Sequence, residues 1–234
     1  MMFVDTSPRD QRIMELVAAF GQLAGGQLAR LVFHERKSHS SRDRVLRRLV
    51  GSDLLAYVDR RQVGGWRSGS AQHVYQLGRK AWPLHHEGRY YLARSIDRHG
   101  LGIADVFVAL VEAERTGKLR MTDFVTEPAC HEDIGHISLT PDARFDVETS
   151  AGHVSYWLEL DMGTERAPQL ADKCRRYWHA VRSDRTKHPL VLFVVPDAER
   201  ISFIQRVVEG GPDEAQGLFR VTELSGLIEM ILEH

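Results

Sequence analysis

Three carboxylates in the second half of the chain have the types and spacing for metal chemistry. Asp142 follows Pro141 and begins one expected strand, and Glu159 ends the next. A hairpin of these strands brings both carboxylates together, and Asp161 lies two residues after Glu159 on the same strand face. Three convergent oxygens suit Mg²⁺ or Mn²⁺, which can activate water and offset charge on a phosphate being cleaved. Asp142, Glu159 and Asp161 are therefore candidate metal ligands and catalytic residues.

A structural role is the alternative for the same carboxylates. Asp142 is then a turn residue, while Glu159 and Asp161 pair with cations of the next helix. The candidate cations are Arg166, Lys173 and Arg175.

The elements around these residues predict a sheet flanked by helices. We expect strands over 122–127, 143–148, 154–160, 189–195 and 218–222, and helices over 167–182, 198–209 and 223–232. The run 189–195 is apolar throughout, as in a strand buried on both faces. This order predicts an α/β sandwich with a mixed sheet.

The first part of the chain predicts three helices followed by a hairpin. A helix from Pro8 to Phe20 is capped by Ser7, a short one covers 27–33, and a third is capped by Ser41. Strands over 54–61 and 73–78 follow, joined by a glycine- and serine-rich tip. This order predicts a winged helix-turn-helix, whose third helix enters the major groove of DNA.

Basic and aromatic side chains gather on the third helix and the hairpin. The candidate DNA-binding residues are Arg42, Arg44, Arg47, Arg48, Arg60, Arg61, Trp66 and Arg67. Arginine can bond guanine edges in the groove, and the hairpin tip can touch the backbone or minor groove. The alternative is an ordinary solvated face on a domain that pairs with another protein.

Charge divides the chain in the same way. Residues 1–100 hold 17 Lys and Arg against 9 Asp and Glu, a net charge of +8, and the rest holds 14 against 23, a net charge of −9. We expect a winged-helix domain over 1–95 that binds double-stranded DNA, and a second domain over 96–234. Many winged helices dimerise, so we also expect a homodimer.

Several classes of protein are disfavoured. No apolar run approaches the roughly 18 residues of a membrane helix, and the start lacks a signal-peptide pattern, so we expect a cytoplasmic protein without a membrane partner. The two cysteines, Cys130 and Cys174, have no metal-site or disulfide spacing. No nucleotide-binding loop or hydrolase triad is recognisable. No cofactor is expected, except Mg²⁺ or Mn²⁺ if the protein is a nuclease.

The carboxylate pattern resembles the signature of the PD-(D/E)xK nuclease-like fold, the fold of restriction endonucleases. In that signature an aspartate and an acidic residue hold the metal, and a lysine follows two residues later. Here Asp142 and Glu159 match the acidic positions, but Asp161 occupies the position of the lysine. Without that ammonium the resemblance implies an inactive domain, unless Lys173 on the next helix replaces it.

Over most of its length the chain resembles the replication-relaxation family. The resemblance is carried by segments 44–49, 99–106 and 158–165, with Lys173 and Tyr177. It implies a DNA-binding protein of a plasmid, phage or actinobacterial genome that acts in replication or its control. Two alternatives stay open: a metal-dependent nuclease targeted by the winged helix, and a winged-helix transcription regulator whose second domain senses a ligand.

Overall fold

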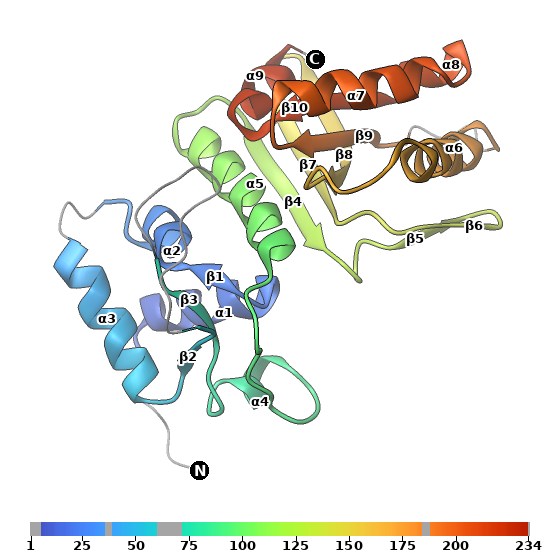
Figure 1. Ribbon diagram of the computed structural model, residues 1–234. Helices are drawn as coiled ribbons and strands as arrows, with labels where there is room; N and C mark the ends of the chain where they lie inside the picture. Colours follow the sequence, from blue (N-terminus) through green and yellow to red (C-terminus); the bar gives the residue numbers. More distant parts are fainter. Residues whose placement is uncertain (1–5, 36–38, 60–71, 184–187, 234) are drawn as a thin grey trace. The chain divides into compact units, whose positions relative to one another are not determined.

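The structure, a computed structural model, describes residues 6–35, 39–59, 72–183 and 188–233 (Figure 1). The chain divides into two compact units, Met1–Val108 and Ala109–His234. The expected fold class, helices combined with a mixed sheet, is confirmed. The expected domain bounds, 1–95 and 96–234, stay a prediction.

The first unit combines helices with a small antiparallel sheet. Its elements are α1 (Pro8–Phe20), β1 (Leu23–Ala24), α2 (Gly25–Val32), α3 (His39–Gly51), β2 (Leu55–Tyr57), β3 (Val74–Leu77), α4 (Trp82–His85) and the first part of α5 (Arg98–Arg115). The strand order is β1-β3-β2, and both pairs are antiparallel. The expected pairing of the strands that flank the hairpin tip is therefore present, although residues 60–71 lie outside the described part of the chain.

The helices of this unit form where apolar side chains recur every three to four residues. Ile13 and Val17 of α1 and Leu49 of α3 are completely buried. Helix α1 begins with a capping box, in which the Asp10 backbone N–H donates to Ser7 Oγ at 3.3 Å and the Ser7 N–H donates to Asp10 Oδ2 at 3.0 Å. The expected cap of α1 is confirmed.

The expected cap of the third helix is wrong. Helix α3 begins at His39, so Ser41 lies inside its first turn rather than before it. Serine is tolerated there because its hydroxyl can bond nearby backbone groups from within a first turn as well as from a cap.

A tight approach of two backbone segments closes the end of β3. Asp53 adopts a left-handed conformation, with φ 60°. A Cβ added to Gly78 would lie 2.3 Å from the Asp53 carbonyl oxygen. The Gly78 N–H also donates to the Leu54 carbonyl at 2.8 Å. Only glycine fits at this position without displacing the backbone opposite.

Three buried glutamines fasten the segment that follows the small sheet. Gln22, Gln27 and Gln76 are each less than 10% exposed. Their amides bond this segment at 2.7–3.2 Å, with partners Tyr91, Ala93, Ser95, Asp97, Leu101 and Asp105. Polar bonds from side chains, five of the six to backbone groups, therefore hold residues 91–105 in place.

The second unit is built on a five-stranded sheet. Its elements are β4 (Arg120–Thr126), β5 (Glu132–Ile134), β6 (Ile137–Leu139), β7 (Ala143–Thr149), β8 (Gly152–Leu160), α6 (Ala167–Ser183), β9 (Leu190–Val195), α7 (Ala198–Glu209), α8 (Asp213–Gln216), β10 (Phe219–Glu223), a 3₁₀ turn (Leu224–Gly226) and α9 (Leu227–Leu232). The order is β10-β9-β8-β7-β4. Strands β8, β9 and β10 run parallel, whereas β7 runs antiparallel to both of its neighbours, β4 and β8.

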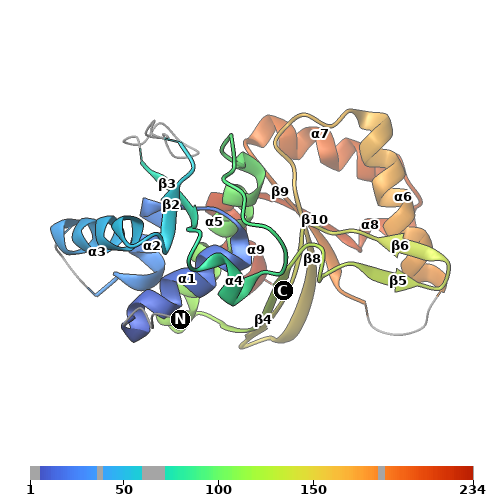
Figure 2. The same ribbon diagram turned by 90° about the horizontal axis from the view of Figure 1, so that it is seen from below.

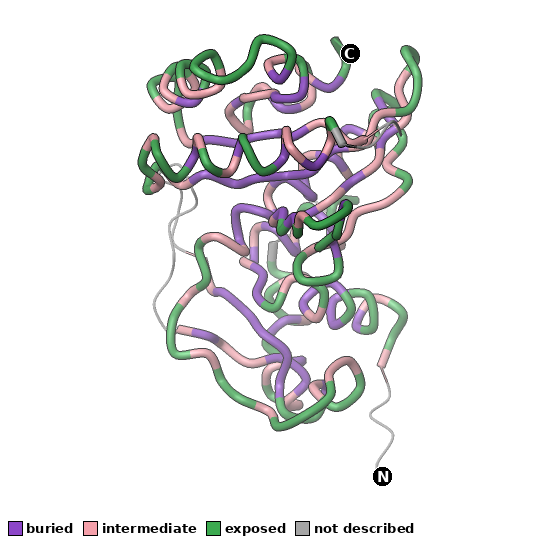
Figure 3. Tube along the Cα trace, turned by 90° about the vertical axis from the view of Figure 1, so that its right-hand side faces the viewer, coloured by how far each residue is buried: buried purple, intermediate pink, exposed green. Residues whose placement is uncertain are grey.

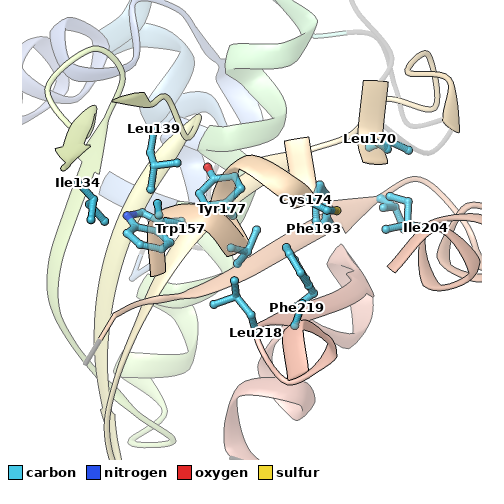
Figure 4. Packing of buried hydrophobic residues seen from close by; sticks show 14 residues of the cluster. Ile134, Leu139, Trp157, Leu170, Cys174, Tyr177, Phe193, Ile204, Leu218 and Phe219 are labelled. Carbon is cyan, nitrogen blue, oxygen red and sulfur yellow. The ribbon is translucent and has the colours of Figure 1, made fainter. Parts of the chain in front are cut away.

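Helices α6 and α7 pack on one face of this sheet. Trp157 of β8, Phe193 of β9 and Tyr177 of α6 belong to one buried cluster, and Figure 4 shows their side chains together. Figure 3 shows buried stretches in the central strands, where β9 is buried at every position after its first. The β5–β6 hairpin contacts α6 and lies beside it (Figure 2). The sequence prediction contained neither this hairpin nor the short elements β1, α4 and α8.

Candidate functional site

Glu159 lies near the end of β8 on the face that α6 covers. It is only 3% exposed. Trp157, two residues earlier on the same face, packs in the apolar cluster under α6. The carboxylate therefore lies where an apolar side chain would be expected, and burial of such a group is costly unless it is paired and hydrogen-bonded.

Helix α6 supplies both partners of the Glu159 carboxylate. Lys173 Nζ donates to Oε2 at 2.7 Å, and the Tyr177 hydroxyl donates to Oε1 at 2.6 Å. Lys173 and Tyr177 are four residues apart, so one helix face presents both donors. Each carboxylate oxygen thus has a donor from α6.

Lys173 also joins Glu159 to the loop after β8. Its Nζ donates to Glu165 Oε1 at 2.9 Å. The Lys173 side chain is 29% exposed and that of Glu165 34%, so the ammonium lies at the edge of the core with carboxylates on two sides. This bridge fixes the loop against the helix.

The surroundings of Glu159, Lys173 and Tyr177 raise the pKa of all three groups and so favour their protonated forms. Burial raises the pKa of Glu159 to about 7; the charge of Asp142 adds to this effect and that of Lys173 opposes it. Burial lowers the pKa of Lys173, but the charge of Glu159 and the bonds to both carboxylates raise it by more than burial lowers it. The net pKa is therefore raised, and the ammonium stays charged. Burial and the charge of Glu159 raise the pKa of Tyr177, so its hydroxyl remains a donor.

The hairpin places Asp142 beside Glu159. In the β7–β8 register Ala143 lies opposite Leu158, so Asp142 follows as the residue opposite Glu159. Asp142 Oδ2 accepts from the Leu160 N–H at 2.7 Å. This bond links the residue before β7 to the last residue of β8, at the end of the hairpin away from its turn.

Asp161 has a different cationic partner from Glu159. Its Oδ2 accepts from Arg200 of α7, with Nε at 3.1 Å. Its Oδ1 accepts from the N–H of Gly163, which has a φ of 82°. Arg200 also donates to the Glu165 backbone carbonyl at 2.7 Å. Asp161 thus organises the turn after β8 and its contact with α7.

A divalent cation does not fit this arrangement as it stands. The oxygens of Glu159 and Asp161 that would bind a metal accept from Lys173, Tyr177 and Arg200. Across the parts of the chain that the structure describes, no group of three or more His, Cys, Asp or Glu side chains could hold a metal ion. Of the cations proposed as structural partners, Lys173 is the one that pairs with Glu159.

Sequence reasoning missed Arg200 as part of this network. It lies 39 positions after its partner Asp161, and no local pattern links the two. Tyr177 is buried on the same helix, and its spacing of four from Lys173 could have indicated a second donor to the same carboxylate. Both cysteines are buried and free.

The arginines of α3 fall into two groups. Arg44 and Arg47 are exposed, while Leu46 and Leu49 are buried. Arg47 Nε donates to the backbone carbonyl of Asp43 in the same helix at 3.2 Å. Arg44 and Arg47 therefore offer their guanidinium groups to solvent.

The second group consists of Arg42 and Arg48, which are engaged within the unit. Arg42 bonds its neighbour Asp43 at 2.8 Å. Arg48 Nη2 donates to Oδ1 of Asp10 at 2.6 Å, and this carboxylate side chain is only 3% exposed. Arg60, Arg61, Trp66 and Arg67 lie outside the described residues.

Comparisons with known proteins give a single assignment. In the described parts of the chain, no helix has the length and apolar character needed to cross a membrane. No curated protein and no solved structure matches the chain. The replication-relaxation family matches residues 14–193, which is more than half of the sequence. The chain therefore belongs to the replication-relaxation family.

Proposed function

We propose that this protein binds double-stranded DNA through a winged helix-turn-helix in its first unit and acts in replication or its control. Family membership supports the role in replication or its control. The observation that carries DNA binding is the exposure of Arg44 and Arg47 on α3, opposite the buried Leu46 and Leu49. A helix with an apolar inner face and a basic outer face is what a major groove accepts.

The rest of the first unit supports the same proposal. Three helices precede an antiparallel strand pair, β2 and β3, which is the order of a winged helix. The first 100 residues carry a net charge of +8, which favours phosphate contacts. We further propose that the protein binds as a homodimer, and light scattering coupled to size exclusion would measure its mass in solution.

DNA binding is tested by fluorescence anisotropy with labelled duplex DNA over a series of salt concentrations. The wild type should lose affinity steeply as salt rises, since phosphate contacts release counterions. Arg44→Ala with Arg47→Ala should weaken binding by about 1–3 kcal/mol, which is about 5-fold to 150-fold, and reduce the salt slope by about 1 to 2.

A matched control removes equal charge elsewhere. Arg12→Ala with Arg175→Ala deletes two exposed arginines, one from α1 and one from α6. This pair should retain wild-type affinity. If both double variants lose affinity equally, or neither does, binding by α3 is refuted.

We propose that the second unit is a nuclease-like domain that does not cleave DNA. The sheet order supports the likeness, with Asp142 directly before β7 and Glu159 in the adjacent strand β8. The bonds from Lys173 and Tyr177 to both Glu159 oxygens support the lack of cleavage, because they occupy the metal-binding atoms. Its role is then assembly, partner binding or recognition of DNA structure.

A metal-dependent nuclease is the second candidate, and one observation favours it. Lys173 reaches Glu159 beside Asp142, so an ammonium from α6 is available where the signature lysine is replaced by Asp161. Incubation of duplex and single-stranded DNA with the protein in Mg²⁺ or Mn²⁺ decides between the two. Cleavage that disappears in Asp142→Ala with Glu159→Ala supports the nuclease, and intact DNA under binding conditions supports the silent domain.

A further inference from the structure

The Lys173 ammonium occupies a position with the surroundings of a bound cation. Its Nζ lies 2.7 Å from Glu159 Oε2 and 2.9 Å from Glu165 Oε1. The two carboxylates come from β8 and from the loop that follows it, and Asp142 is close enough to raise the pKa of Glu159. Carboxylate oxygens such as these are also the ligands that Mg²⁺ and Mn²⁺ prefer.

The Glu165 side chain, which is 34% exposed, has one oxygen bound by Lys173 and one that is not. Its Oε2 atom is enclosed and has no hydrogen-bond partner among the residues that the structure describes. A carboxylate oxygen in this condition has unused capacity to bind a cation. Lys173 satisfies the other oxygen of the same group.

We infer that Lys173 is an internal counter-ion that replaces a divalent cation, and that its removal turns Glu159 and Glu165 into a Mg²⁺ or Mn²⁺ site. One or two carboxylates with water ligands are sufficient for such ions. In the wild type the ammonium excludes them, because a second positive charge at this point would be repelled and would find its ligands taken. This deepens the proposed lack of cleavage and concerns the second unit alone.

The test measures cation binding by the full-length protein without DNA. The melting temperature and the Mn²⁺ electron paramagnetic resonance signal are recorded for the wild type, Lys173→Ser and Lys173→Arg. We expect no Mn²⁺ binding by the wild type or Lys173→Arg, which keeps the charge. We expect Lys173→Ser to bind Mn²⁺ and gain about 3–6 °C at a concentration tenfold above its Kd.

A double variant assigns the site. Lys173→Ser with Glu159→Gln should lose the gain, because the amide is a poorer ligand than the carboxylate. Mn²⁺ binding by the wild type that Glu159→Gln abolishes would overturn the inference, and so would a folded Lys173→Ser that binds no Mn²⁺. If Lys173→Ser is unfolded, recovery of its circular dichroism signal with Mn²⁺ supports the inference, and failure to recover it overturns it. Because no DNA is present, this inference and the DNA-binding proposal can fail separately.

Discussion

Replacement of Arg48 by alanine separates a stabilising arginine of α3 from those that we propose contact DNA. Arg48 pairs at 2.6 Å with Asp10, whose carboxylate side chain is 3% exposed and caps α1. Loss of one partner of a fully buried ion pair costs about 3–5 kcal/mol. Here the Ser7 bonds to Asp10 remain and the Arg48 side chain is 47% exposed. We therefore expect Arg48→Ala to lower the free energy of unfolding by about 1–2 kcal/mol.

Urea denaturation at neutral pH measures this loss, and hydrogen exchange of the peptide at the start of α1 locates it. Arg47→Ala is the matched control, because Arg47 lies on the same helix but bonds only the backbone of its own helix among the contacts described. Its cost should stay within about 0.5 kcal/mol. Equal stability of the Arg48→Ala and Arg47→Ala proteins would refute the assignment of Arg48 to the fold.

The stability that Arg48→Ala loses should depend on pH. Burial raises the pKa of Asp10, but the bonds from Ser7 and the charge of Arg48 lower it by more than burial raises it. The pKa in the folded protein therefore lies below the ordinary aspartate value of 3.8. The stability that this group contributes is present above the unfolded pKa and lost as the pH falls through the folded one. The gap between wild type and Arg48→Ala should thus be widest near neutral pH and shrink in acid. A gap of constant size would contradict the ion pair as its cause.

Further predictions concern both units. Gly78→Ala should lower the free energy of unfolding by about 2 kcal/mol or more, because its methyl group overlaps the backbone opposite, whereas Gly51→Ala meets no atom within 4 Å and should be near neutral in the same urea assay. The Glu159 carboxyl contributes stability that is full below the ordinary glutamate pKa of 4.5 and lost as the pH rises through about 7. Glu159→Gln should flatten that part of the curve of stability against pH. Burial raises the pKa of the Cys130 thiol to about 11 and that of Cys174 to about 12, so both should react with a thiol reagent in the native protein no faster than it unfolds.

The long elements of the fold could be predicted from sequence because each carries its own periodic signal. Strand β9 has an unbroken apolar run, and α6 repeats its apolar residues at helical spacing. The two-residue strand β1 and the β5–β6 hairpin have too few residues for any period to emerge. Their pairing depends on tertiary contacts, such as Ile134 and Leu139 packing in the cluster under α6.

The candidate site was predictable in its position but not in its pairing. Alternation along β8 places Glu159 and Asp161 on one face, and the hairpin brings Asp142 near. The strand ends at Leu160, however, and the turn after it directs Asp161 to Arg200 of α7. Which helix lies above which carboxylate depends on how α6 and α7 pack, and strand spacing contains no information about that.

The bonds of the buried glutamines also bear on where the chain can be cut to give a stable fragment of the first unit. A fragment that ends at residue 95 would remove the Asp97 donor to Gln22 and both acceptors of the Gln27 side-chain amide. Each buried polar group left unsatisfied costs about 1–3 kcal/mol. That loss is large for a domain of this size, whose total stability is about 5–15 kcal/mol. We therefore expect that a stable fragment for DNA-binding studies, one that contains α1, α2 and α3, must extend past Asp105.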